Sequence, residues 1–237
     1  AAITQSPIDE HAPSRLARLI QQLATDEQLT TEEISLEWFK RYWACAIEPA
    51  IRLYDEHGIA LEAHQQNSLL DITDGYPSHY YFRDNQGFYL SESHRELLIA
   101  LESKARNTED LFYSDTMICD RFTYYLIVNQ LFSIINRFGI DGLISEASLL
   151  KITCHKLQQL QRNLKGVGSE LVSAILKQPT LPCKGNLLTR IDDVDELQAE
   201  LELAVYTHIR NPFLGLMSMD AVETVNPKVH EVSLETA

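Results

Sequence analysis

The chain has 237 residues, a formal net charge of -14 and a hydrophobic share of 45%. This is the composition of an ordinary globular protein, long enough to bury a large core in one or two domains. The acidic balance argues against a nucleic-acid partner, because counterion release from phosphates requires a basic surface, but a local cluster of Arg and Lys can still hold a small anion.

The four cysteines lie far apart and lack C-x-x-C spacing: Cys45, Cys119, Cys154 and Cys183. We interpret them as reduced core residues of a cytoplasmic protein, because disulfides are rare in reducing compartments. Residues 1–12 contain neither a basic region nor an apolar run, so no secretory signal is expected.

Residues 122–136 carry no charge, and this stretch is the strongest candidate for a membrane span. It is shorter than the ~20 apolar residues that a span needs. Four polar residues also interrupt it, namely Asn129, Gln130, Ser133 and Asn136. We therefore predict a buried core helix and no membrane partner.

The first part of the chain is predicted to form two helices followed by short strands. Residues 14–25 are amphipathic, and a longer helix is expected over residues 31–57, kinked by Pro49 and closed by Gly58. Strand-like runs follow at residues 59–61, 68–72, 79–82 and 88–90, with a tight turn between the second and third.

From residue 93 onward the pattern is helical again. Helices are expected over residues 93–106, 115–138, 145–163 and 167–178. Pro179 and Pro182 should break the pattern before a strand or extended loop at residues 184–191, and a last, acidic helix is expected over residues 192–206.

The predicted fold class is α+β and predominantly helical, with a small antiparallel sheet that carries a polar turn, followed by a helical bundle. We divide the chain into a palm-like part with that sheet and turn (residues 1–92), a thumb-like helical part (93–214) and a loose tail (215–237).

The polar turn after the first predicted strand has the residue types of a metal–triphosphate site. Glu62 stands five residues before Asn67, and Asp84 stands seventeen residues after it, at the end of another strand. Neighbouring strands lie ~4.8 Å apart, so the three oxygen-bearing side chains can converge as Mg²⁺ prefers. His64 and Arg83 would then offer hydrogen bonds or positive charge to phosphate.

Two other interpretations of this spacing stay open. An acid, four residues and an Asn, followed by a strand-borne Asp, also occur in kinases and small-molecule phosphotransferases. Here Asp84 is not followed by Phe-Gly, and no glycine-rich loop or strand lysine precedes the turn. Alternatively, Glu62 and Asn67 satisfy turn amides, Arg83 and Asp84 form a surface ion pair, and the chain is a non-catalytic helical interaction module.

Longer motifs resemble the IucA/IucC family of siderophore synthetases, which work without a peptide-synthetase template. The motifs are HGIALEAHQQNSL (57–69), YFRD (81–84) with Gly87, DRFTY (120–124), KGNLLTR (184–190) and NPF (211–213). The resemblance spans roughly residues 30–214. It departs from the family pattern at NPF, where the family typically has Asn-Pro-Leu.

The resemblance implies an ATP- and Mg²⁺-dependent ligase. Such enzymes adenylate a carboxyl group, commonly of citrate or a derivative, and join it to an amine or hydroxyl as an amide or ester. The implied metal ligands are Glu62, Asn67 and Asp84. The same three residues, with His64 and Gln66, would bind the nucleotide. The implied catalytic residues are His64 and Arg83, and the implied substrate-binding residues are Arg121, Tyr124 and Lys184.

The resemblance also implies that this chain is the carboxy-terminal part of such an enzyme, because family members are longer and carry a nucleotide grip in their amino-terminal portion. On its own it should hold half a site, bind ATP weakly and not turn over. Its partners would be the missing part of the enzyme and the two substrates, and a homodimer would fit the family.

Overall fold

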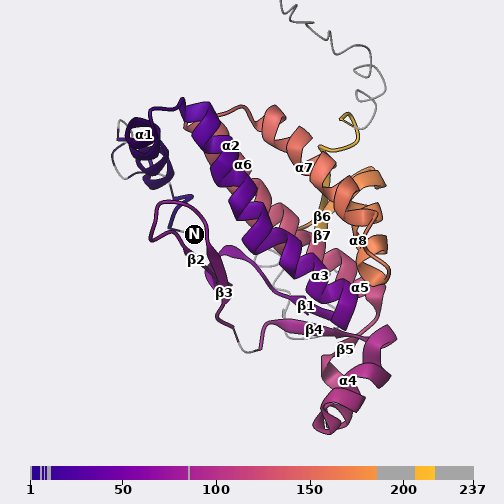
Figure 1. Ribbon diagram of the computed structural model, residues 1–237. Coiled ribbons are helices and arrows are strands. Elements are labelled where there is room, and N and C mark those ends of the chain that lie inside the picture. Colours follow the sequence, from indigo (N-terminus) through magenta and orange to yellow (C-terminus); the bar gives the residue numbers. More distant parts are fainter. Residues whose placement is uncertain are drawn as a thin grey trace, which may run out of the picture.

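The computed structural model describes residues 2–5, 7, 9, 12–84, 86–185 and 206–216. Helices make up most of it, and the short strands form three separate sheets in different places around the helices (Figure 1). The α-helices are α1 (Arg15–Glu27), α2 (Thr31–Tyr42), α3 (Glu48–His57), α4 (Arg95–Leu101), α5 (Asp115–Phe122), α6 (Phe132–Ile140), α7 (Glu146–Gln161) and α8 (Val167–Lys177).

The strands are short, and there are seven of them in the described ranges. They are β1 (Ile59–Leu61), β2 (Ser68–Asp71), β3 (His79–Phe82), β4 (Phe88–Ser91), β5 (Phe112–Tyr113), β6 (Thr180–Lys184) and β7 (Tyr206–Arg210). The predicted fold class, α+β and predominantly helical, is confirmed.

The predicted helix over residues 31–57 is continuous but not uniformly α-helical. The side chains of Thr30 and Glu33 form a capping box at its start, and Gly58 ends it with a left-handed φ of 67°. Between α2 and α3 lies a π-helical segment, η1 (Trp43–Ile47). Proline lacks an N–H and its ring clashes with the preceding turn, so the wider π register just before Pro49 is the local adjustment.

The predicted helix over residues 115–138 likewise has three parts. A nine-residue π-helical segment, η6 (Thr123–Leu131), joins α5 to α6. The uncharged stretch is buried as predicted: Phe122, Leu126 and Leu131 are at most 1% exposed. The predicted helix over residues 93–106 is less regular, because 3-10 segments η3 (Glu92–His94) and η4 (Ser103–Asn107) flank α4.

The first four strands form two separate sheets, where we expected a single small one. β1 pairs antiparallel with β4, which pairs parallel with β5, a strand that we did not predict. β2 and β3 form their own antiparallel hairpin. The chain passes from the first sheet to the second at residues 62–67 and returns at residues 83–87, so both crossings lie at the same junction between the sheets.

The last described sheet corrects two predictions. The helical pattern ends at Lys177, before Pro179 and Pro182 as predicted, but the strand that follows begins at Thr180 and not at Lys184, so Pro182 lies inside β6, opposite His208 of β7. A two-stranded ribbon has an open edge on each strand, so a proline without an N–H is tolerated there. Tyr206 begins β7 and therefore does not end a helix; residues 192–205 of that predicted helix and the predicted tail beyond residue 216 lie outside the described residues.

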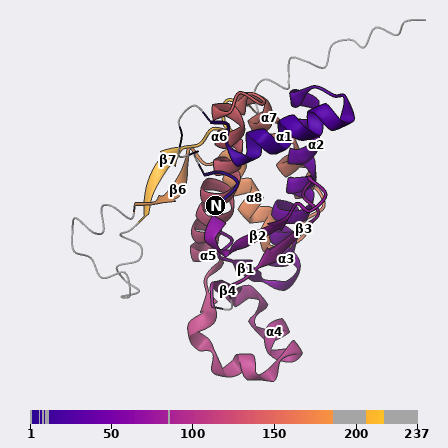
Figure 2. The same ribbon diagram turned by 90° about the vertical axis from the view of Figure 1, so that its left-hand side faces the viewer.

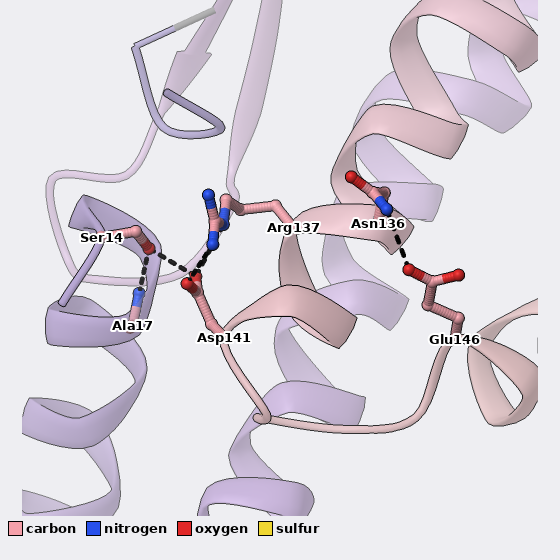
Figure 3. A network of polar contacts seen from close by, with 6 residues as sticks. All are labelled: Ser14, Ala17, Asn136, Arg137, Asp141 and Glu146. Carbon is pink, nitrogen blue, oxygen red and sulfur yellow. Dashed lines mark hydrogen bonds and ion pairs between the residues drawn. The ribbon is translucent and has the colours of Figure 1, made fainter. Parts of the chain in front are cut away.

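One hydrophobic core holds these parts together and takes side chains from Leu16 to Phe213, on both sides of residues 92/93. α8 packs against α3 and α7, and the β6–β7 ribbon lies beside η6 (Figures 1 and 2). α1 is tied on by a buried polar contact in Figure 3: the Ser14 hydroxyl donates to Asp141, 2.5 Å away, and Asp141 also pairs with Arg137.

Candidate nucleotide and substrate site

The polar turn between β1 and β2 is held by its own backbone. The N–H of Glu62 donates to the carbonyl of Gly87, which extends the β1–β4 ladder by one bond. The chain then forms a 3-10 turn, η2 (Gln65–Asn67), in which the Asn67 N–H donates to the His64 carbonyl. Asn67 is 8% exposed, so its amide points into the protein and needs partners there.

The structure brings Asn67, Asp84 and Glu62 together. The Asn67 amide nitrogen lies 3.0 Å from Asp84 Oδ2, 3.3 Å from the Glu62 carbonyl and 3.2 Å from His64 Nε2. Gly87 packs directly against this cluster: a Cβ at that position would lie 2.7 Å from Asp84 Oδ2 and 3.2 Å from Glu62 Cβ, so a larger residue would displace these side chains.

The pKa values of both His64 and Asp84 are lowered in this cluster, which favours a neutral imidazole and an ionised carboxylate. Burial lowers the pKa of His64 below its ordinary value, although the negative charges of Glu62 and Asp84 oppose this shift. The backbone N–H of Gln86 lowers the pKa of Asp84, and the Asn67 amide adds to the effect. Near neutral pH the site therefore presents a neutral imidazole beside an ionised carboxylate.

The side chain of Glu62 is oriented by a buried tyrosine. The Tyr89 hydroxyl donates to Glu62 Oε1, and Tyr89 is only 7% exposed. The Arg121 guanidinium lies over the Tyr89 ring, 5.0 Å from its centroid, and is 5.1 Å from the Tyr113 centroid. Arg121 is 6% exposed, so the structure places it behind Tyr89 and not on the wall of the neighbouring cavity.

A polar cavity of about 570 Å³ opens beside Glu62 and His64. Four elements line it: the turn, η6, α6 and the end of β6. The lining residues are Glu62, His64, Gln65, Gln66, Tyr124, Tyr125, Asn129, Ser133 and Lys184. Asn67, Arg83 and Asp84 are not among them; Arg83 is exposed, and its backbone N–H donates to the Asn67 carbonyl.

Tyr124 and Lys184 both line this cavity. The family resemblance implied that both bind substrate. Four lining residues were missed as site residues: Gln65, Tyr125, Asn129 and Ser133. Tyr125 lies within residues 122–136, which we predicted to form a buried core helix. The signal for Asn129 and Ser133 was present, since both interrupt that run, but we used it only against a membrane span.

The donor set fits a hydrated Mg²⁺ that also binds phosphate. In the part of the chain that the structure describes, no group of three His, Cys, Asp or Glu side chains is arranged to hold a metal ion. Mg²⁺, however, usually takes one or two carboxylates and completes its shell with water and phosphate. Glu62 and Asp84 can supply those carboxylates, and a half-turn of the Asn67 amide would present its oxygen.

Comparison with known proteins identifies the family. Residues 36–199 match the family model described as "Ferric iron reductase FhuF-like transporter". The chain belongs to this FhuF-like family.

The FhuF-like chain is also similar to siderophore enzymes, which confirms the resemblance seen in its sequence. It is 45% identical over 203 residues to the spermidine-citrate ligase of Bacillus anthracis, covering 85% of this chain and 33% of that protein. It is 38% identical over 208 residues to the rhizobactin siderophore biosynthesis protein RhbC of Rhizobium meliloti, covering 86% and 35%. The chain therefore spans about a third of the length of these relatives.

Solved structures show the same fold. The ATP-bound aerobactin synthetase IucA of Klebsiella pneumoniae superposes on the FhuF-like chain with a TM-score of 0.78 at 23% identity, covering 90% of this chain and 36% of the other. Among the described residues, no helix is both long and apolar enough to cross a membrane.

Proposed function

We propose that the chain is the carboxy-terminal part of an ATP-dependent siderophore synthetase. The complete enzyme would activate a carboxyl group of citrate or a derivative and join it to an amine or hydroxyl. The observation that carries the proposal is the meeting of Glu62, Asn67 and Asp84 beside a polar cavity that contains Lys184. The similarity to a citrate ligase supports the same substrate class.

Each residue of the site has a proposed task. Glu62 and Asp84, with the Asn67 amide, would hold Mg²⁺ and through it the triphosphate. ATP supplies the leaving group that makes a carboxyl carbon reactive. Lys184 carries the positive charge that a polycarboxylate needs, and Tyr124 offers a hydroxyl to the same cavity.

His64 is suited to accept a proton. Its pKa is lowered by burial, so the imidazole is neutral near pH 7 and can take the proton that an attacking amine or hydroxyl gives up. Gln66 faces the cavity and would donate to phosphate. Arg83 is exposed and lies outside the cavity lining, and its proposed task is to offer positive charge to phosphate from there. Arg121 would act on the carboxylate only after moving from behind Tyr89.

The isolated chain should bind ATP weakly and not turn over, because it spans only about a third of the length of its relatives. ATP is supplied in the cytoplasm, where we expect the enzyme to work. The homodimer and the palm-like and thumb-like division at residues 92/93 stay predictions.

The test is an assay of the complete synthetase with ATP, Mg²⁺, citrate and a panel of amines and hydroxylamines. We expect citrate-dependent release of AMP and pyrophosphate, reduced about 100-fold or more by Asp84→Asn, since removing one preorganised electrostatic group typically has that effect. Asp71→Asn is the matched control, because Asp71 belongs to the same hairpin but accepts from Thr73; this variant should release AMP at the wild-type rate. Release of ADP would instead indicate a phosphotransferase and overturn the proposal.

A further inference from the structure

Two consecutive amide side chains on η6 hold the ends of the polar turn. Asn129 Oδ1 accepts from the Gln65 N–H at 3.2 Å, and the Asn129 carbonyl accepts from Gln65 Nε2 at 3.3 Å. Next to it, Gln130 Oε1 accepts from the Ser68 hydroxyl at 2.6 Å. Gln65 begins the 3-10 turn and Ser68 follows its last residue, so the pair brackets the turn.

These contacts are partly buried, and Gln130 is the most deeply buried residue among them. Gln130 is 3% exposed, and Ser68 is also within 2.8 Å of the His64 carbonyl and of the Tyr80 hydroxyl. A buried amide of this kind is stable only when its polar atoms are paired, so the network favours one position of the turn.

The π-helical register explains why η6 can hold the turn and line the cavity at once. In a π-helix the backbone bonds run from residue i to residue i+5, which places Tyr124 and Asn129 on the same side. Both line the cavity, and Asn129 also lies close enough to Tyr124 to lower the pKa of its hydroxyl slightly against the larger upward effect of burial. Tyr125, on the same segment, packs against the His64 ring at 5.6 Å.

We propose that Asn129 and Gln130 are positioning residues that set the place of Glu62, His64 and Asn67 relative to the cavity wall formed by η6. Substrate contact at Tyr124 and the placement of the metal- and triphosphate-binding turn are thereby coupled through one helix. We call the contacts of Asn129 with Gln65 and of Gln130 with Ser68 the clamp. Its effect on catalysis rests on the proposed function, whereas the contacts themselves are a property of this chain.

The first experiment measures hydrogen exchange at the Gln65 backbone amide in the 237-residue chain. Asn129→Leu removes the acceptor at similar size and should raise the exchange rate at Gln65 about tenfold or more. Asn129→Asp keeps an acceptor oxygen and should restore protection. Asn136→Leu is the control: Asn136 lies on α6, the continuation of the same helix, and its amide donates to Glu146 and not to the turn (Figure 3).

The second experiment measures AMP release by the complete synthetase carrying Gln130→Met, a substitution of a residue that does not line the main cavity. We expect kcat to fall about 100-fold, the effect of a misplacement of roughly 1 Å, while KM for the carboxylate changes less than threefold.

Three results would decide the matter. Unchanged exchange at Gln65 in Asn129→Leu overturns the clamp. Faster exchange at Gln65 in Asn129→Leu, combined with an unchanged kcat in Gln130→Met, overturns the positioning role. Faster exchange at Gln65 in Asn129→Leu, together with a wild-type complete enzyme that releases no AMP with any carboxylate, supports the clamp and overturns the proposed function instead.

Discussion

Asp55 fastens the loop between α7 and α8, and its removal should destabilise the whole chain. The residue lies on α3 and is 8% exposed. Its Oδ1 accepts from the N–H groups of Gly166 at 2.8 Å and Gly168 at 3.0 Å, and its Oδ2 accepts from the Lys165 N–H at 3.1 Å. A Cβ at Gly168 would lie 2.6 Å from Asp55 Cβ, so glycine is required for this approach.

The size of the effect follows from the number of donors. Asp55→Ala leaves three N–H groups without their acceptor, and each unpaired buried donor costs about 1–3 kcal/mol. Part of the loop can rehydrate, so we expect a loss of about 3–5 kcal/mol, out of the ~5–15 kcal/mol typical of a folded domain. Asp55→Asn keeps one acceptor oxygen for the two glycines and should lose about 1–2 kcal/mol.

Urea unfolding followed by far-ultraviolet circular dichroism measures this loss. The control is Glu56→Ala, a change at the exposed neighbour on the same helix, which should stay within about 0.5 kcal/mol of the wild type. If Asp55→Ala also stayed within that range, with an unchanged dependence on urea, the carboxylate would not hold the loop and the reasoning would be refuted.

Three further substitutions test the site. Gly87→Ala places a Cβ 2.7 Å from Asp84 Oδ2; AMP release by the complete enzyme should fall at least about tenfold, and a retained rate would show that Asp84 is not needed where it stands. Tyr89→Phe removes the hydroxyl that donates to Glu62, so the Mg²⁺ concentration for half-maximal activity should rise about tenfold or more, as for other partners of metal ligands; no rise would contradict the orienting role. The pKa of His64 in the folded protein lies below its ordinary 6.5, so the unfolded chain binds more protons as pH falls through 6.5. The contribution of neutral His64 to the free energy of unfolding is therefore complete above about pH 6.5 and declines below it. His64→Gln should flatten this decline between pH 7 and 5 in denaturant titrations, and an unchanged slope would argue against a buried neutral imidazole.

Local patterns in the sequence predicted much of the fold. Hydrophobic periodicity and the stop at Gly58 predicted the helix over residues 31–57, and the strand-like runs at 59–61 and 79–82 match β1 and β3. The acid–amide spacing around Glu62 and Asn67 predicted that a polar turn would meet Asp84. These features depend on neighbours within a few residues, where periodicity and backbone geometry act directly.

Long-range pairing decided what those patterns left open. Nothing local states that β1 pairs with β4 while β2 pairs only with β3, and that division puts residues 62–67 beside residues 83–87. Whether Arg121 faces a ligand or lies behind Tyr89 depends on the packing of two side chains that are far apart in the sequence. The π register of η6 also departs from the 3.6-residue period on which helix prediction relies, so the contact between Asn129 and Gln65 could not be predicted from periodicity.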